Sequence, residues 1–363
     1  MKINFIDLKA QYREYQAEID KEVLEVFSSA QFIGGEKLNS LESNLAQYTG
    51  AKHAIGCSSG TDALLLSLMA LDIGPGDEVI TTPFTFIATA EVIAFLGAKS
   101  VFVDIDEESY NIDPSKIKNV VTDRTKAIMP VSLYGQCSDM DAINEIAKEF
   151  DIPVIEDACQ SFGATYNGKK SCNLSTIGCT SFFPSKPLGA YGDGGAIFTN
   201  DDEIASKIRM LLNHGQNERY KHKYIGINGR LDAVQAAVLG VKLKHFDKEV
   251  RLRDEIGSRY SDLLEDTNVI TPKISDENTS VYAQYSIRVE DREAMVAKLT
   301  ELEIPTAVHY PVPLHMQEAF KSLGYGEGDF PISEKVSTQI MSLPMSPYLT
   351  EKEQDFIVES IKG

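Results

Sequence analysis

The sequence has no tryptophan and a shortage of positive charge. Its 35 Lys and Arg residues are outnumbered by 54 Asp and Glu residues, so the formal net charge at pH 7 is −19. Binding to a polyanion depends on clustered Lys and Arg side chains that neutralise its phosphates. The charge balance therefore argues against a nucleic acid as partner, although a small anion could still bind in a local pocket.

Long apolar runs are also absent. A membrane-spanning helix needs about 18 to 20 consecutive apolar residues, and the most apolar stretch, around Ala88–Ala98, is interrupted by Glu91. Near the N-terminus Asp7 and Lys9 interrupt the apolar residues, so this segment lacks the core of a signal peptide. We therefore expect a cytoplasmic protein with no membrane partner.

Cysteine is scarce, and no two cysteines form a Cys-x-x-Cys pair. An odd number of cysteines in a chain of this length argues against a disulfide framework and against a zinc site. We expect reduced, mostly buried thiols and no bound metal. The five residues are Cys57, Cys137, Cys159, Cys172 and Cys179.

The overall composition is that of a folded globular protein, with 363 residues of which 43% are hydrophobic and 25% charged. At roughly 150 residues per domain, this length predicts two domains, or one large and one small. Between about residues 50 and 200 short apolar segments alternate with amphipathic ones, and the pattern changes afterwards. We place a large domain at residues 1–245 and a smaller C-terminal domain at residues 246–363.

The alternation indicates an α/β fold, with a mostly parallel, doubly wound sheet covered by helices on both faces. The predicted strands are His53–Cys57, Glu78–Thr82, Ser100–Asp104, Ala127–Val131, Pro153–Glu156 and Gly178–Phe183. The predicted helices between them are Asp62–Leu71, Ile87–Leu96, Pro114–Asn119 and Asp139–Phe150. Later in the chain we expect helices at Asp201–Asn213, Asp232–Arg253, Arg292–Leu302 and Glu351–Ile361, and a strand at Ser280–Val289. Ligands of such sheets bind at the carboxyl ends of the strands, so the loops there are the expected site.

Residues 58–62, Ser-Ser-Gly-Thr-Asp, directly follow one predicted strand and begin a helix. Small residues let the backbone approach an anion, and the free N–H groups and dipole of the helix N-terminus favour a phosphate. The segment has neither the GxGxxG spacing of a dinucleotide site nor the GK[ST] ending of a P-loop. An ordinary capped turn, with Ser59 or Thr61 as N-cap, explains the same residues.

Two further segments place a carboxylate and an amine after predicted strands. Asp157 follows the apolar run in Ile152–Gln160; it is either a cap of the next segment or the partner of a protonated heterocyclic nitrogen. Lys186 lies in a loop rich in glycine and proline, Thr180–Gly195. Most lysines are solvated surface charges, but desolvation or a nearby cation would lower the pKa of Lys186 and make it a nucleophile. An anion cup, a carboxylate and an amine together indicate a site for pyridoxal 5′-phosphate (PLP).

Three segments, Ser58–Ala63, Glu156–Gly163 and Ser181–Gly189, resemble the nucleotide-sugar aminotransferases of the DegT/DnrJ/EryC/StrS family. The resemblance runs from Phe5–Leu8 to Ser342–Tyr348, which is essentially the whole chain. It implies the aspartate-aminotransferase fold (PLP fold type I), PLP as cofactor and L-glutamate as amino donor. It also implies a homodimer with its active sites at the interface.

The resemblance assigns roles to individual residues. Lys186 would hold the cofactor through its aldehyde, and Asp157 would pair with the pyridinium nitrogen. The other implied cofactor contacts are Gly60, Thr61 and Ser181 with the phosphate, Asn228 with the phosphate in the other subunit, Phe86 with the ring face and Gln160 near the ring hydroxyl. The implied substrate contacts are Arg230, whose planar guanidinium suits a sugar carboxylate, and His309 and Tyr310, for which core packing at a turn remains the alternative.

Four further segments resemble one branch of the family most closely: Val131–Gln136, Ser171–Thr176, Val281–Tyr285 and Thr306–Pro311. Members of this branch aminate the 3-keto group of UDP-2-acetamido-2-deoxy-3-oxo-glucuronate, on the route to bacterial surface polysaccharides such as lipopolysaccharide O-antigen. Three alternatives stay open. They are an aminotransferase for a 4-keto-6-deoxy nucleotide sugar, a PLP-dependent sugar dehydratase and a non-catalytic phosphate-binding α/β protein.

Overall fold

The computed structural model describes residues 2–363. Its α-helices are α1 (Leu8–Ser29), α2 (Glu36–Thr49), α3 (Gly60–Ala70), α4 (Ala88–Phe95), α5 (Pro114–Ile117), α6 (Met140–Glu149), α7 (Asp202–Leu211), α8 (Ala233–Leu264), α9 (Arg292–Glu301), α10 (Pro331–Gln339) and α11 (Glu351–Lys362). Its strands are β1 (His53–Cys57), β2 (Glu78–Thr81), β3 (Lys99–Phe102), β4 (Thr125–Ile128), β5 (Ile155–Asp157), β6 (Thr165–Tyr166), β7 (Lys169–Lys170), β8 (Ile177–Ser181), β9 (Gly195–Thr199), β10 (Gln216–Glu218), β11 (Lys221–His222), β12 (Tyr285–Arg288) and β13 (Ile340–Leu343). Short 3₁₀ turns lie at Lys118–Val120, Leu314–Met316 and Glu318–Leu323.

The central sheet is built from a three-stranded part, β3-β2-β4, and a four-stranded part, β5-β8-β9-β1. Two parallel bridges, Ile128 with Val154 and Val131 with Asp157, join β4 to the β5 side. Only β9 runs antiparallel to its neighbours β1 and β8. The other strands of this sheet are parallel to one another, so their carboxyl ends meet at one edge.

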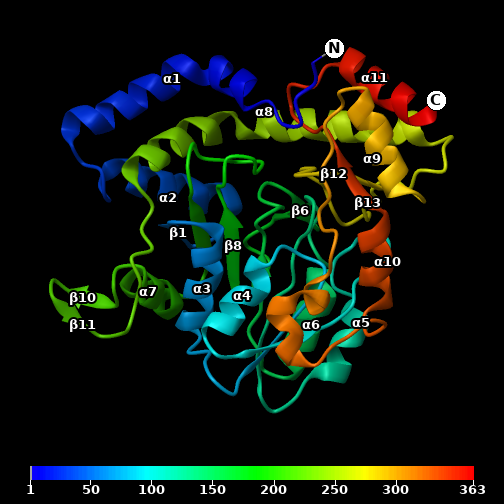
Figure 1. The fold of residues 1–363 in the computed structure, drawn as a ribbon. Coiled ribbons are helices and arrows are strands. Elements are labelled where there is room, and N and C mark those ends of the chain that lie inside the picture. The colour runs from blue at the N-terminus through cyan, green and yellow to red at the C-terminus, as the bar shows by residue number, and fades with distance from the viewer. Residues whose placement is uncertain (1) are drawn as a thin grey trace.

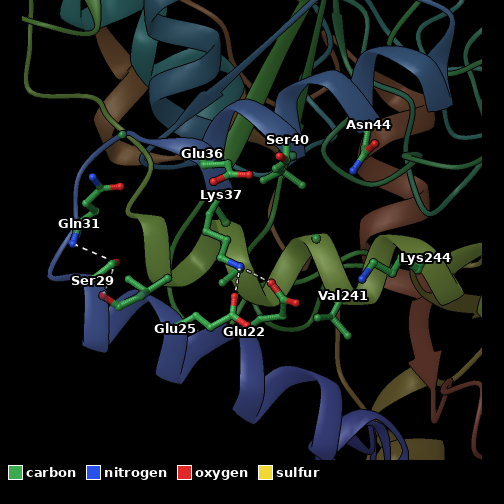
Figure 2. A pocket seen from close by; sticks show the side chains of 16 residues that line it. Glu22, Glu25, Ser29, Gln31, Glu36, Lys37, Ser40, Asn44, Val241 and Lys244 are labelled. Carbon is green, nitrogen blue, oxygen red and sulfur yellow. Dashed lines mark hydrogen bonds and ion pairs between the residues drawn. The ribbon is translucent and has the colours of Figure 1, made fainter.

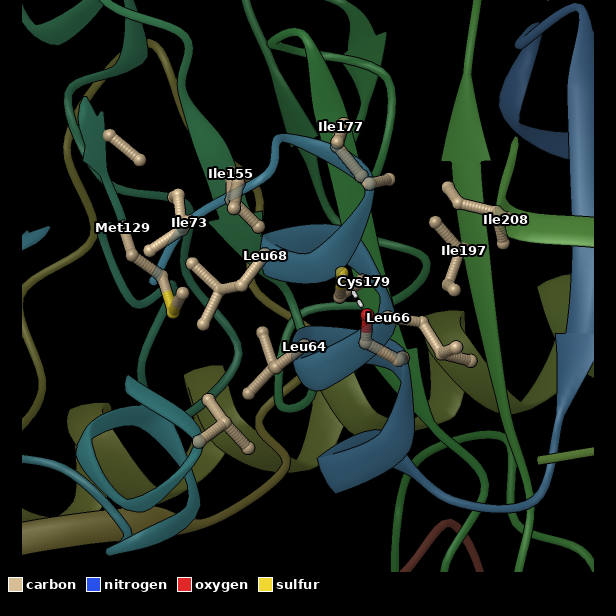
Figure 3. Close-up of a cluster of buried hydrophobic side chains, with 14 of the residues drawn as sticks. Leu64, Leu66, Leu68, Ile73, Met129, Ile155, Ile177, Cys179, Ile197 and Ile208 are labelled. Atoms are coloured by element: carbon tan, nitrogen blue, oxygen red, sulfur yellow. Dashed lines mark hydrogen bonds between the residues drawn. The ribbon is translucent and has the colours of Figure 1, made fainter. Parts of the chain in front are cut away.

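The core of this sheet lies against α3, whose leucines are almost completely buried. Figure 3 shows Leu64, Leu66 and Leu68 of α3 among isoleucines of the strands, and all three leucines are at most 1% exposed. Burying a leucine side chain stabilises a fold by about 1.5–3 kcal/mol. A helix that is apolar on nearly every side can lie only inside the molecule. Because α3 begins three residues after the end of β1, its N-terminus lies at the carboxyl edge of that strand.

A long helix, α8, runs across the molecule and connects the region of α1 and α2 with the small core at the other side (Figure 1). Its first half packs against α1 and α2, and its second half packs in the small core with α11. The antiparallel pair β12–β13 forms the sheet of that small core. The division expected at residue 245 falls inside this continuous helix and stays a prediction.

The expected elements between residues 50 and 200 are all present, with bounds that differ by three residues or fewer. Three strands of this region were not predicted: β9, which lies between β1 and β8, and the two-residue strands β6 and β7. The strand expected at Ser280–Val289 is shorter, because the chain turns before Tyr285 and Tyr282 has a positive φ of 40°. Within residues 2–363, no helix combines the length and apolarity that crossing a membrane requires.

Candidate active site

The segment after β1 forms a cup of free backbone donors. Ser59 is the N-cap of α3, because its hydroxyl accepts the Asp62 N–H at 3.0 Å. The N–H groups of Gly60 and Thr61 have no hydrogen-bond partner within residues 2–363. Free N–H groups at the start of an eleven-residue helix are suited to binding a phosphate. The N-cap and the anion cup are thus one structure.

Ser181, at the end of β8, lies directly against this cup. A Cβ added at Gly60 would lie only 2.6 Å from the Ser181 Cβ and 3.0 Å from the Cys159 Sγ, so position 60 requires glycine. The Ser181 hydroxyl accepts the Phe183 N–H at 3.2 Å, which leaves its proton free to donate. The side chain of Ser181 therefore extends the set of donors that begins at α3.

Asp157, the last residue of β5, is 4% exposed and has partners on both carboxylate oxygens. Thr89 of α4 donates its hydroxyl proton to Oδ2 at 2.8 Å, and the backbone N–H of Cys159 donates to Oδ1 at 3.2 Å. The second contact is the cap that the sequence suggested, whereas the first holds the carboxylate from another element. A buried carboxylate fixed in this way can stabilise a cation placed beside it.

Lys186 lies on a tight loop, in which its own N–H bonds to the Phe183 carbonyl at 2.9 Å. Its Nζ has no hydrogen-bond or ion-pair partner in the described chain. Desolvation lowers the pKa of Lys186, and the nearby Cys159 and Asp157 oppose that shift only in part. A lysine amine with a lowered pKa and no partner is a candidate nucleophile and base.

Gln160 and Phe86 both lie near Tyr310. Oε1 of Gln160 accepts the Tyr134 N–H at 3.0 Å, and its Nε2 donates to the Tyr310 hydroxyl at 3.3 Å. The Phe86 ring is 53% exposed, and its centroid lies 6.1 Å from that of Tyr310. The exposed face of Phe86 is thus free to stack on a ligand.

His309 is held in place from two directions. Its Nδ1 pairs with the Ser342 hydroxyl at 2.9 Å, and its backbone carbonyl accepts a hydrogen bond from the Tyr134 hydroxyl. Burial lowers the pKa of His309, and the charge of Lys186 lowers it further.

Asn228 and Arg230 lie on the segment that follows the β10–β11 hairpin, which projects from the body of the molecule in Figure 1. This segment meets the cup, because the Gly229 carbonyl accepts the Ser58 N–H at 2.9 Å. Nη1 of Arg230 donates to Asn213 Oδ1 at 2.6 Å, and its Nε is buried without a partner. The Asn228 side chain is exposed.

Nine of the eleven predicted site residues therefore lie at or near the carboxyl edge of the sheet, while Asn228 and Arg230 lie on the neighbouring segment that meets the cup through the Gly229 carbonyl. Sequence reasoning missed Thr89 and Tyr134, which hold Asp157, Gln160 and His309 in place. Thr89 carried a weak signal, because it and Glu91 are the two polar residues of an apolar segment; the structure shows that Thr89 is only 1% exposed. Tyr134 carried none, because its contacts depend on how distant segments meet.

A pocket of about 360 Å³ lies between α1, α2 and α8 (Figure 2). Lys37 reaches into it from α2 and forms ion pairs with Glu22 and Glu25 of α1. None of the residues that line this pocket is a predicted site residue. In residues 2–363 no three His, Cys, Asp or Glu side chains lie close enough to hold a metal ion.

Comparison with known proteins identifies close relatives over the full length of the chain. An aminotransferase from Pseudomonas aeruginosa, UDP-2-acetamido-2-deoxy-3-oxo-D-glucuronate aminotransferase, is 54% identical over 96% of each chain. The structure of DesV from S. venezuelae, in complex with a ketimine intermediate, matches with a TM-score of 0.97 and 37% identity over 99% of this chain and 98% of that one. NtdA from Bacillus subtilis, with bound cofactor PMP, matches with a TM-score of 0.90 and 34% identity over 96% of this chain and 81% of that one.

The model of the DegT/DnrJ/EryC1/StrS aminotransferase family matches residues 13–362. The solved relatives share the whole fold, which confirms the prediction of an aminotransferase of fold type I. The family match and the site geometry agree with the three motifs seen in the sequence. The chain belongs to the DegT/DnrJ/EryC1/StrS aminotransferase family.

Proposed function

We propose that this chain is a PLP-dependent aminotransferase that moves the amino group of L-glutamate to the 3-keto group of UDP-2-acetamido-2-deoxy-3-oxo-glucuronate. The observation that carries the proposal is the meeting of three groups at one edge of the sheet. They are the unpartnered Lys186 amine, the buried Asp157 carboxylate and the free donors of Gly60 and Thr61. The alternative of a non-catalytic binding protein leaves the unpartnered, desolvated amine without a role.

The residues present fit PLP. Gly60, Thr61 and Ser181 would hold the phosphate, Phe86 would stack on the ring and Asp157 would keep the ring nitrogen protonated. PLP, when bound, supplies an aldehyde for the amine and a ring that accepts the electron pair released at the donor's Cα. Gln160 would face the ring hydroxyl.

Lys186 acts as the proton carrier. Its amine would take the proton from Cα of glutamate as general base and then hold it as the general acid of the same half-reaction. The lowered pKa suits this role, because a neutral amine is present at a lower pH than for a solvated lysine. In the second half-reaction the same amine moves a proton in the opposite direction, at the sugar C3, which predicts ping-pong kinetics.

The sugar would be recognised by Arg230, His309 and Tyr310. A bidentate guanidinium suits the carboxylate of a uronate. His309 lies close enough to Lys186 for the lysine charge to lower its pKa, and the Tyr310 hydroxyl accepts a hydrogen bond from Gln160. The identity of 54% with the P. aeruginosa enzyme, whose name states this substrate, supports the same assignment here. The product would enter surface polysaccharide synthesis, such as that of O-antigen.

We also propose a homodimer in the cytoplasm, with active sites at the interface. The Asn228 side chain is exposed, and Asn228 and Arg230, which share one segment, would both serve the active site of the second subunit. Mixing Lys186→Ala chains with Asn228→Ala/Arg230→Ala chains should restore part of the activity, because one site of each heterodimer is intact. An active monomer in sedimentation would contradict this arrangement. All five cysteines are free, which fits a reducing compartment.

The experiment that tests the substrate is incubation of the purified protein with L-glutamate and a panel of UDP-keto-sugars, followed by mass spectrometry of the products. The proposal expects a 3-amino uronate and 2-oxoglutarate. Amination of a 4-keto-6-deoxy sugar instead would overturn the substrate, and loss of a hydroxyl without amination would mean a dehydratase.

A further inference from the structure

Two side chains of α8 hold the loop that carries Lys186. Lys242 donates a hydrogen bond from Nζ to the carbonyl of Gly189, three residues beyond Lys186. Gln235 accepts the Tyr191 N–H at 2.9 Å, and its Nε2 reaches the Tyr191 carbonyl at 3.5 Å. Positions 235 and 242 are seven residues apart, which places them on one face of the helix, two turns from each other. We call this pair the α8 clamp.

The clamp acts on a loop that is closed on itself. The Ala190 N–H donates to the Phe182 carbonyl at 2.7 Å, so the two ends of the Lys186 loop are tied together. A Cβ at Gly189 would lie 2.4 Å from the Pro184 carbonyl oxygen, so the returning strand of the loop lies against the outgoing one. A shift of Gly189 therefore moves the backbone on both sides of Lys186.

The charge of Lys242 needs an explanation beyond packing. The residue is 3% exposed, and its Nζ lies 5.2 Å from the Tyr191 ring centroid. Desolvation lowers the pKa of Lys242 to about 8, whereas Glu249 favours the charged form. A methionine would fill the same space without the cost of burying an ammonium group.

The Gly189 carbonyl explains why an amine is present. Among residues 2–363 it has no partner other than Lys242. A buried carbonyl without a partner is destabilising. Apolar packing of the loop against α8 is already supplied by Leu188, Ala190 and Leu239, which share one buried cluster. The hydrogen bond from Lys242 therefore fixes the position of a loop that apolar contacts already keep folded.

We propose that Lys242 and Gln235 are positioning residues for Lys186, which set where its amine lies relative to Asp157. This inference rests on the proposed role of Lys186. Because Lys242 is held by α8 and not by the site, its removal should loosen the loop without removing any group that contacts cofactor or substrate.

The test compares Lys242→Met, Lys242→Arg and the control Lys244→Met in the full chain. Lys244 lies two residues further along α8 and points to the pocket between α1, α2 and α8 (Figure 2), so the control repeats the substitution on the opposite face. Amide hydrogen exchange of residues 183–192, with and without PLP, is the first readout. The second readout is whether each variant changes kcat or KM in the glutamate half-reaction.

For Lys242→Met we expect exchange in residues 183–192 to rise about 10-fold or more, because one buried hydrogen bond is lost. We expect kcat to fall about 10- to 100-fold with little change in KM, because the amine is misplaced while glutamate binding is untouched. Lys242→Arg should keep part of the exchange protection and part of the wild-type kcat. Lys244→Met should match the wild type in both readouts.

Two results would overturn the clamp: equal behaviour of Lys242→Met and Lys244→Met, or a rise in exchange spread evenly over the chain, which would indicate a general structural role. If Lys242→Met does not fold, Gln235→Leu decides by the same readouts, since it removes the bonds to Tyr191. Exchange is measured without substrate, so the clamp and the proposed reaction can fail independently.

Discussion

Arg230 offers the sharpest test of the proposed uronate substrate. Its Nη1 is held at 2.6 Å by Asn213, and in residues 2–363 it has no carboxylate partner within ion-pair distance. The guanidinium is therefore anchored while its charge remains uncompensated. The chain carries a net charge of −19, so its overall field repels an anionic nucleotide sugar and binding depends on local cations such as this one.

The expected magnitude follows from that geometry. A charge-assisted hydrogen-bonded pair in a partly buried position contributes about 1.5–3 kcal/mol, which is roughly 10- to 150-fold in kcat/KM. Arg230→Ala should lose this factor on the uronate and almost nothing on an analogue with CH₂OH at the same carbon. Arg230→Lys should recover only part, because a point charge does not reproduce the planar fork.

The assay measures kcat/KM for both sugars in the wild type and the two variants. Arg251→Ala is the matched control, because Arg251 is exposed on α8 and has no ion-pair partner in the described residues. Asn213→Ala should cause a smaller loss on the uronate, since it frees the guanidinium without removing it. Equal losses on acid and alcohol would refute the reasoning, because Arg230 would then support the loop or the phosphates.

Three further predictions test the rest of the site. The Asp157→Asn variant should still accept the Thr89 hydroxyl proton and bind PLP. Stopped-flow absorbance should show its glutamate half-reaction slowed by orders of magnitude. Unchanged turnover would return Asp157 to a capping role. Gly60→Ala should weaken PLP affinity roughly 10-fold in an absorbance titration, because its Cβ would collide with Ser181, and an unchanged Kd would contradict the cup. Burial raises the pKa of Glu156 from 4.5 to about 7. Between pH 4.5 and pH 7 the folded chain therefore binds more protons than the unfolded chain, and its stability falls as pH rises. Urea unfolding at pH 5 and pH 7.5 should show the wild type losing about 2 kcal/mol relative to Glu156→Gln, and parallel pH profiles would argue against it.

The strands could be predicted where apolar runs are bounded by turn residues, as in β1. Strand β9 could not, because it begins with Gly-Ala directly after a glycine-rich loop, and only its neighbours identify it as a strand. Helix α1 could not be predicted either, because its apolar pattern is weak. Its buried face contains the polar or amphipathic residues Gln11 and Tyr15 beside Ile19 and Val26.

The site residues could be predicted because the chemistry-bearing groups follow parallel strands, whose ends must meet. Asp157 and Lys186 come from different strands, yet both reach the same edge. Tyr134 and Lys242 could not be predicted as site residues, because each acts on a segment distant in the sequence. Such partners are set by how helices pack on the sheet, which local pattern does not encode.

The most direct test of amino transfer at Lys186 is a single-turnover reaction of the PLP-loaded protein with ¹⁵N-labelled L-glutamate and no sugar. The wild type should release one 2-oxoglutarate per site, lose the near-visible cofactor absorbance and retain the ¹⁵N on the protein-bound cofactor. Lys186→Ala should release none. Release of 2-oxoglutarate at the wild-type rate by Lys186→Ala, or no release by the wild type until sugar is added, would contradict the account.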